Sequence, residues 1–185
     1  LEAENLKLNA ELVASQTGAL IQSAEAGLAA GRTAIADKRA PIEVVEAAQA
    51  AAPKVAFTLV GPGETVQAAK GEGSVVVGQA NADGLRLEAR IAPVLPKGGE
   101  TRIVSAGGVV LASARAAEIG QPIRTLIGID ASALVDQAAP RALTLGGQAG
   151  LAAAAQARAG GPYVVAISDG TTASFFDDAW VVLAP

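Results

Sequence analysis

The chain has 185 residues, of which 51% are hydrophobic and only 3% aromatic, and its formal net charge is −4. Its basic residues are scattered singly, so no basic stripe is present that could displace counterions from a nucleic acid. The sequence contains no cysteine and no histidine, which excludes disulfides, thiolate or imidazole catalysis, and zinc sites of the usual composition.

Residues 1 to about 37 predict one long helix, because they contain no proline and few β-branched residues. At 1.5 Å per residue this helix would measure about 50 Å, which exceeds the span of a small domain. Either the helix packs on its own domain, or its first half forms a coiled-coil-like dimer seam that continues toward a membrane helix. We favour the seam, with Leu6, Val13 and Leu20 at the dimer interface. The apolar stripe steps by three and four residues through Leu6, Ala10, Val13, Thr17, Leu20, Ile21, Ala24 and Leu28.

A short second helix and a set of strands follow. Pro41 is placed to begin the helix, which ends before Pro53. Residues 85–92 alternate apolar and charged side chains, which is typical of a half-exposed antiparallel strand. The turn-rich segment 93–99 is a candidate domain boundary. Glycine-rich turns separate the predicted strands, which cover residues 55–60, 65–69, 74–79 and 85–92.

In the second half, two β-branched runs between Arg102 and Ser113 flank Gly107-Gly108 and predict a hairpin. A short helix capped by Asp130 and ended by Pro140 is expected next. Three further strands are predicted, one over residues 142–155, one over 163–168 and one over 179–183.

The sequence also contains a weak internal repeat. Residues 56–69 align with residues 142–155, and Asp83-Gly84 aligns with Asp169-Gly170 at the same offset. This pattern predicts two half-sheets in tandem, of which the first is truncated and lacks the opening hairpin.

The hairpin at 102–113 and the Glu118-Ile119-Gly120-Gln121-Pro122 segment after it resemble the opening of PDC/Cache domains, the PAS-like extracytoplasmic sensor domains of bacteria. The segment around Trp180 is similar to their last strand. The resemblance covers little more than the C-terminal half. It implies an α+β fold, in which the long N-terminal helix packs on an antiparallel PAS-like sheet, as one unit or as two in tandem. The expected division is 1–52 for the N-terminal helices, 53–97 for a small membrane-distal or truncated half-sheet, and 98–185 for the PAS-like unit.

The residues provide no catalytic constellation. Asp177-Asp178 is the only adjacent pair of carboxylates and is best interpreted as a solvated turn, while the glycine-rich segments lack the lysine of a phosphate loop. We therefore expect no enzyme, no cofactor, no bound nucleotide and no metal site. Amino-acid-binding members of the family line one pocket with tyrosines, an arginine, a tryptophan and an aspartate. On that resemblance Arg141, Tyr163 and Asp169 are the candidate ligand-binding residues, although the full motif is not matched and a structural role is favoured for each.

The resemblance implies that the chain is an extracytoplasmic sensory or input domain of a bacterial transmembrane signalling protein. The preferred interpretation of that protein is a two-component sensor histidine kinase. It would lie on the periplasmic face of the inner membrane, would be anchored there in the full-length protein, and would form a homodimer through the N-terminal helix. Chemoreceptors and diguanylate cyclases use the same module. The alternative is a protein-interaction or dimerisation module that binds a protein partner and no small molecule. No residue identifies the signal.

Overall fold

The computed structural model describes residues 2–67, 74–96 and 100–169, which fall into two compact units. The four-stranded unit comprises residues 16–94, and the five-stranded unit comprises residues 1–15 together with 95–185. The first helix contributes to both units.

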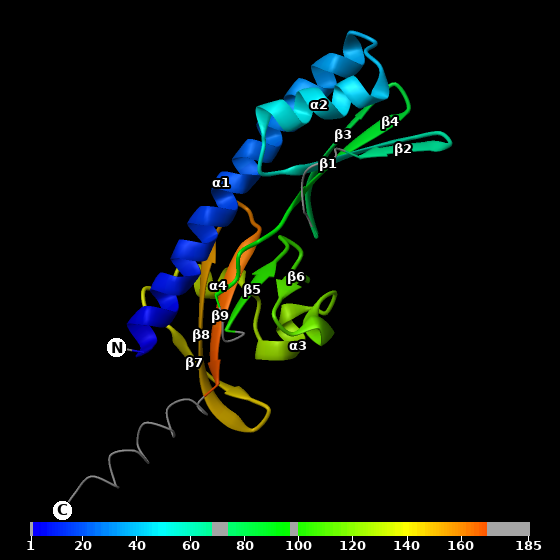
Figure 1. Ribbon diagram of the computed structural model, residues 1–185. Coiled ribbons are helices and arrows are strands. Elements are labelled where there is room, and N and C mark those ends of the chain that lie inside the picture. The colour runs from blue at the N-terminus through cyan, green and yellow to red at the C-terminus, as the bar shows by residue number, and fades with distance from the viewer. Residues whose placement is uncertain (1, 68–73, 97–99, 170–185) are drawn as a thin grey trace, which may run out of the picture. The chain divides into compact units, whose positions relative to one another are not determined.

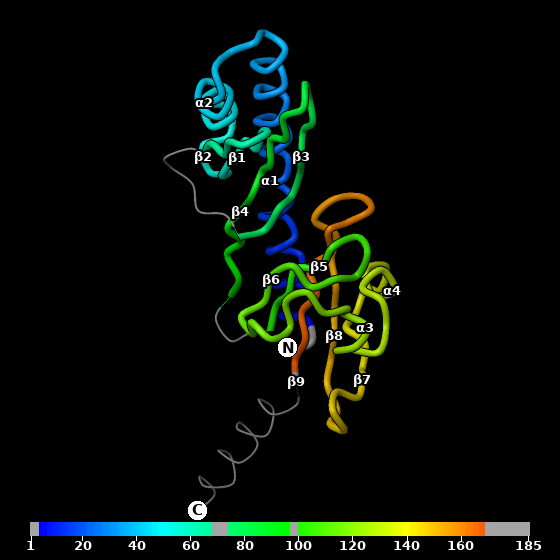
Figure 2. The backbone as a smooth tube through the Cα atoms, turned by 90° about the vertical axis from the view of Figure 1, so that its right-hand side faces the viewer, coloured from blue at the N-terminus to red at the C-terminus, as the bar shows by residue number. Residues whose placement is uncertain are grey.

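Helix α1 runs from Glu2 to Ala36 and helix α2 from Pro41 to Ala51, which confirms both helix predictions. Pro41 begins α2, and the Glu43 carboxylate accepts a hydrogen bond from the Ala40 backbone N–H at 2.9 Å, so that one orphan donor of the first turn is satisfied. Figure 2 shows α2 beside the C-terminal part of α1. Among the described residues, no helix is both long and apolar enough to cross a membrane.

The four-stranded unit holds β1 (Ala56–Gly61), β2 (Glu64–Gln67), β3 (Val75–Ala82) and β4 (Leu85–Ile91) in the antiparallel order β2-β1-β4-β3. Helix α1 approaches this sheet closely because glycines face it. A Cβ on Gly27 would overlap the Phe57 ring, and a Cβ on Gly31 would overlap the Leu87 side chain. These glycines lower helix propensity but permit the close contact.

The five-stranded unit holds β5 (Thr101–Val104), β6 (Val110–Ser113), β7 (Arg141–Leu145), β8 (Gln148–Gln156) and β9 (Tyr163–Asp169). All neighbours pair antiparallel in the order β6-β5-β9-β8-β7 (Figure 1). The antiparallel strands expected around Val104, Val110, Leu143 and Val165 are confirmed. The strand expected around Val182, with Trp180 and Asp177-Asp178, lies outside the described residues.

Short helices follow β6 and cover one face of this sheet: η1 (Ala116–Glu118), α3 (Ile123–Ile127) and α4 (Ser132–Val135). A buried cluster joins them to the strands, formed by Val104, Val110, Ile123, Ile127, Ala131, Leu134, Ala152, Ala154, Val165 and Ile167. The expected cap by Asp130 is wrong: Ala131 is the N-cap residue of α4 and no side chain caps it, while Asp130 supplies only its backbone carbonyl to the Ala133 N–H.

Two further expectations are corrected. Residues 142–155 are not one strand but the β7–β8 hairpin, because Gly146 and Gly147 both take positive φ, 55° and 88°, as a tight two-residue turn requires. The first sheet does not lack its opening hairpin, since β1 pairs with β2 through Gly61 and Glu64.

The two sheets do share a design, but the sequence alignment matched the wrong strands. In the four-stranded sheet, β1 lies between β2 and β4. In the five-stranded sheet, β5 lies in the same way between β6 and β9, so β1 and β5 occupy equivalent places. The alignment had matched residues 56–69 with the β7–β8 hairpin instead. Among the described residues, the four-stranded sheet has no strand in the place that β7 holds in the other sheet.

Candidate functional site

The three candidate ligand-binding residues lie on the five-stranded sheet but do not converge. Arg141 begins β7 and is exposed, while Tyr163, at the start of β9, is half-buried against the core cluster. Asp169 ends β9, six positions from Tyr163, which is roughly 20 Å along an extended strand. A small ligand does not reach across that distance.

The helix-covered face of this sheet is filled by its own side chains. The core cluster brings α3 and α4 directly onto β8 and β9, and Val104, Ile123, Ala152, Ala154 and Val165 are wholly buried.

The expected dimer seam points inward. Leu6 and Val13 are each only 3% exposed within the single chain, and Leu20 is half-buried. Lys7, beside Leu6, donates to the carbonyls of Ala154 at 2.6 Å and of Val135 at 3.3 Å, which ties the start of α1 to β8 and to the end of α4. The stripe read from the sequence is therefore the face by which α1 packs on its own domain. By contrast, Leu8 and Leu12 are 59% and 57% exposed.

The hairpin that opens the five-stranded sheet contains a buried ion pair. Arg102 donates to Glu118 from Nε at 2.8 Å and from Nη2 at 3.0 Å, and the Ser113 hydroxyl donates to the same carboxylate at 2.8 Å. Burial alone would raise the pKa of Glu118, but the hydrogen bonds from Arg102 and Ser113 and the charges of Arg102 and Arg115 outweigh it and hold that pKa below its ordinary value. Arg102 is buried, and the Glu118 carboxylate already accepts hydrogen bonds from Arg102 and Ser113. We therefore interpret this network as a structural one that holds η1 against β5 and β6, and not as a binding site.

The four-stranded sheet presents a different surface. Its β4 alternates strictly: Leu87, Ala89 and Ile91 are wholly buried on one face, while Arg86, Glu88 and Arg90 share the other. The half-exposed strand predicted over 85–92 is thus confirmed.

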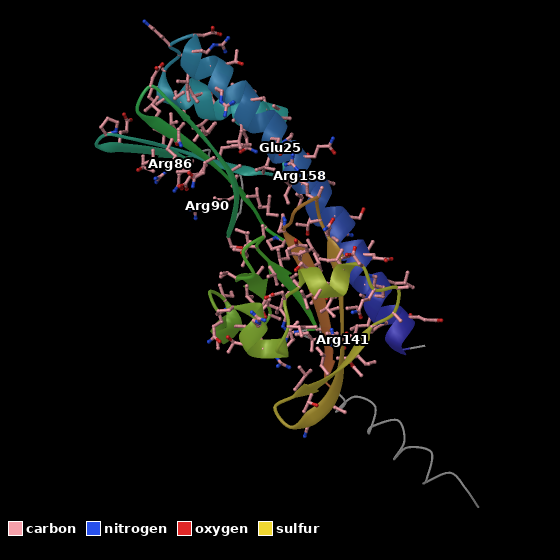
Figure 3. The ribbon with its side chains drawn as sticks, turned by 180° about the vertical axis from the view of Figure 1, so that it is seen from behind. Glu25, Arg86, Arg90, Arg141 and Arg158 are labelled. Carbon is pink, nitrogen blue, oxygen red and sulfur yellow. The ribbon has the colours of Figure 1, made fainter. Side chains whose placement is uncertain are left out.

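Uncharged polar side chains flank this charged row. Strand register places Thr58 and Gln79 on either side of Glu88, and Asn81 beside Arg86. Figure 3 shows Arg86 and Arg90 projecting from β4 on the side of the sheet away from the helices. We call the surface formed by Thr58, Gln79, Asn81, Arg86, Glu88 and Arg90 the polar face.

Two guanidinium groups hold one carboxylate at the centre of the polar face. Arg86 Nε lies 3.0 Å from Glu88 Oε1, and Arg90 Nη2 lies 3.2 Å from Glu88 Oε2. The Glu88 side chain is 11% exposed, whereas those of Arg86 and Arg90 are 49% and 42% exposed. The row therefore carries one net positive charge and keeps exposed donors on both arginines.

Arg90 also has an unused donor. Its Nε is buried and makes no hydrogen bond in the described structure, and a buried donor without an acceptor is costly. An anionic group that brought a carboxylate oxygen to this N–H would satisfy it. The polar face is the candidate binding surface. In the sequence, the polar face is indicated by the alternation Arg-x-Glu-x-Arg. The same alternation is typical of any half-exposed strand and does not by itself predict a binding surface.

A shallow groove of about 520 Å³ lies elsewhere in the four-stranded unit, lined by Gln16, Thr17, Ala19, Leu20, Ser23, Lys54, Ala92, Pro93 and Val94. The described residues also contain no cluster of three or more acidic side chains that could hold a metal ion.

Comparison with known proteins identifies the fold. No family model and no curated protein matches the chain. Among solved structures, the ligand-binding domain of the amino acid chemoreceptor PctB of Pseudomonas aeruginosa PAO1 matches in its complexes with L-Arg and with L-Gln, each at a TM-score of 0.55. The alignments cover 92% and 98% of this chain and 96% and 99% of PctB, at 10% and 11% identity.

The ligand-binding domain of the Campylobacter jejuni chemoreceptor Tlp3, in complex with 4-methylisoleucine, matches at a TM-score of 0.51 over 91% of this chain and 92% of Tlp3, with 11% identity. The fold is that of the PDC/Cache sensor domains. This confirms the α+β expectation of a long N-terminal helix packed on antiparallel PAS-like sheet.

Among the described residues, the five-stranded unit has one strand more than the four-stranded unit. The neighbours are ligand-binding domains, which agrees with the expectation that this chain is not itself an enzyme.

Proposed function

We propose that the chain is the extracytoplasmic sensory input domain of a bacterial transmembrane signalling protein. The observation that carries this proposal is the PDC/Cache architecture: two antiparallel sheets share one long helix, and the alignment to chemoreceptor ligand-binding domains spans nearly the whole chain. Because one helix belongs to both units, a ligand-dependent change in one sheet can be transmitted as a shift of that helix.

The output is proposed to be a two-component histidine kinase, with a chemoreceptor as the alternative. The solved neighbours are chemoreceptor domains, but a shared fold does not by itself separate the two outputs. Phosphorylation assays on the full-length protein in membrane vesicles distinguish them: a kinase incorporates phosphate from ATP by itself, whereas a chemoreceptor does so only with an added kinase.

The signal is proposed to be a small anion that binds the polar face. Two exposed guanidinium groups, the unpaired Arg90 Nε and flanking amides suit a carboxylate with a polar tail. This is a different site from the one expected at Arg141, Tyr163 and Asp169, of which Tyr163 and Asp169 lie roughly 20 Å apart along β9.

Thermal unfolding across a panel of amino acids and organic acids tests this site. A ligand at one hundred times its Kd adds about 2.7 kcal/mol of stability, which is a shift of several degrees in a domain of this size. Arg90→Met removes the unpaired donor and should abolish the shift. Thr65→Val, on the neighbouring strand β2, is the control that should retain it. A shift that survives Arg90→Met would place the ligand elsewhere.

One observation favours the second candidate function, a protein-interaction module. The chain connects β2 to β3 with residues 68–74, whereas β6 and β8 are joined by η1, α3, α4 and β7. Among the described residues, the polar face therefore has no counterpart of the α3–α4 cover. If no compound in the panel shifts the unfolding temperature, binding of a protein partner becomes the preferred function.

We also propose a homodimer through α1, on a different face from the one expected. Leu8 and Leu12 are exposed one turn apart, and the exposed stripe continues at Ser15 and Ala19 without a charged residue. Leu12→Asp should remove the part of self-association that runs through α1, and so lower the average mass in sedimentation equilibrium while the circular dichroism spectrum is unchanged. A wild type that stays monomeric at high concentration would refute the dimer.

A further inference from the structure

The outer edge of β3 is the one sheet edge in the described structure that has no charged residue, no proline, and neither a paired strand nor a segment hydrogen-bonded along it. An exposed strand edge presents unpaired N–H and C=O groups, and proteins protect such edges with charges, prolines or covering segments. The segment Val75–Ala82 contains no charged residue and no proline, and no described strand pairs with its outer side.

The other three edges are protected. Strand β2 carries Glu64 and contacts α2. Strand β6 is covered by the segment around Gln121, whose carbonyl accepts from the Val110 N–H at 2.9 Å. Strand β7 begins at the exposed Arg141, directly after a proline.

The five-stranded unit shows what a covered edge looks like. There β8, the counterpart of β3, pairs with β7 along residues 148–152. Like β3, β8 is built from small residues and glutamine. Among the described residues, no strand takes the corresponding place beside β3.

We propose that this place is taken by β3 of a second copy of the chain, so that two four-stranded sheets join into one continuous sheet. Only one irregularity interrupts the strand, between Val76 and Gly78, and the stretch Gly78–Ala82 keeps regular register with β4. That stretch is available for an antiparallel partner.

The sequence of this stretch is self-complementary. When two copies run antiparallel about Ala80, Gln79 lies opposite Asn81 of the partner subunit, and Gly78 lies opposite Ala82 of the partner subunit. Gln79 and Asn81 are both exposed on the polar face, and their side-chain amides can each donate and accept. On the other face, only small residues meet, so that the joined sheets pack without overlap. This proposal does not depend on the sensory function.

Cysteine cross-linking tests the edge and its register, since the chain has no cysteine of its own. Chains carrying Gln79→Cys and chains carrying Asn81→Cys, with tags of different size, are mixed and oxidised in a Leu12→Asp background that removes association through α1. Directly opposite positions bring Cβ atoms within about 5 Å, whereas diagonal positions do not. We expect the mixed disulfide to exceed either homodimeric one several-fold. Equal yields, or yields no higher than for Val94→Cys chains, would overturn the proposal.

Charge variants provide a second measurement on the same background. In Gln79→Lys/Asn81→Lys, like charges meet across the seam and should abolish association. In Gln79→Lys/Asn81→Glu, opposite charges meet at the same positions, so association should be retained. Both positions are exposed, so the fold of the single chain should be intact in each. Identical sedimentation of the two variants would contradict the pairing.

Discussion

Neighbouring residues of α1 differ sharply in their surroundings. Val13 is 3% exposed in the core of its unit, whereas Leu12 is 57% exposed. The sequence placed Val13 correctly on the apolar stripe of the helix. It could not tell whether that stripe faces the chain's own sheet or a second helix, because both partners are apolar and follow the same periodicity.

Val13→Asp should therefore unfold the five-stranded unit instead of merely separating a dimer. A carboxylate in that position loses water and gains no partner, at a cost of about 3 kcal/mol or more. Leu12→Asp is the matched control and should cost within about 1 kcal/mol. Urea unfolding of dilute protein, where association does not contribute, measures both. Equal stability of the two variants would show that Val13 is not in the core.

Glu118 should make stability depend on pH. Its pKa is lowered in the folded state, so the folded chain binds a proton less readily than the unfolded chain. The stabilisation is thus complete above the ordinary value of 4.5 and is lost as the pH falls through the lowered pKa.

Glu118→Gln removes the titrating group and should flatten this dependence. The free energy of unfolding of the wild type should fall more steeply than that of the variant below pH 4.5. Chemical unfolding at several pH values between neutral and acid measures both slopes. Parallel pH profiles would mean that Glu118 is not the linked group.

At the scale of elements, sequence reasoning succeeded where a pattern is local. The two helices, the 102–113 hairpin and the alternation of β4 depend on prolines, turn glycines and periodicity, which need no knowledge of the rest of the chain. It failed for residues 142–155, where the predicted strand ran through the Gly146-Gly147 turn because mostly small apolar residues stand on both sides of these glycines. It also missed the polar face, because which strands lie beside β4 is decided by long-range pairing.

The contact of α1 with the four-stranded sheet depends on Gly27. A Cβ there would lie 2.2 Å from the Phe57 ring and 3.0 Å from the Ala48 carbonyl oxygen. Gly27→Ala should therefore destabilise the unit, although alanine raises helix propensity by about 1 kcal/mol.

Adding Phe57→Leu to the Gly27→Ala chain should restore part of the lost stability, because the smaller leucine side chain leaves room for the Cβ of the new alanine. A double-mutant cycle by chemical unfolding measures the coupling between the two positions. Additive effects would show that Gly27 and Phe57 are not in contact.

At the scale of the whole molecule, the central claim is that a PDC/Cache domain of this kind lies outside the cytoplasm. The fold was predictable in outline from the hairpin and its flanking segment, but compartment is a property that no residue in the chain encodes directly. It requires a measurement in cells.

That measurement is labelling of a single introduced cysteine in the full-length protein. Val94 is 77% exposed, and the chain has no cysteine to compete. In a version whose other cysteines, if any, are replaced by serine, Val94→Cys should react with a membrane-impermeant maleimide in cells whose outer membrane is permeabilised and whose inner membrane is intact. Lysed cells serve as the control for reactivity. Labelling to the same extent before and after lysis is the predicted result, and labelling only after lysis would contradict an extracytoplasmic sensory domain.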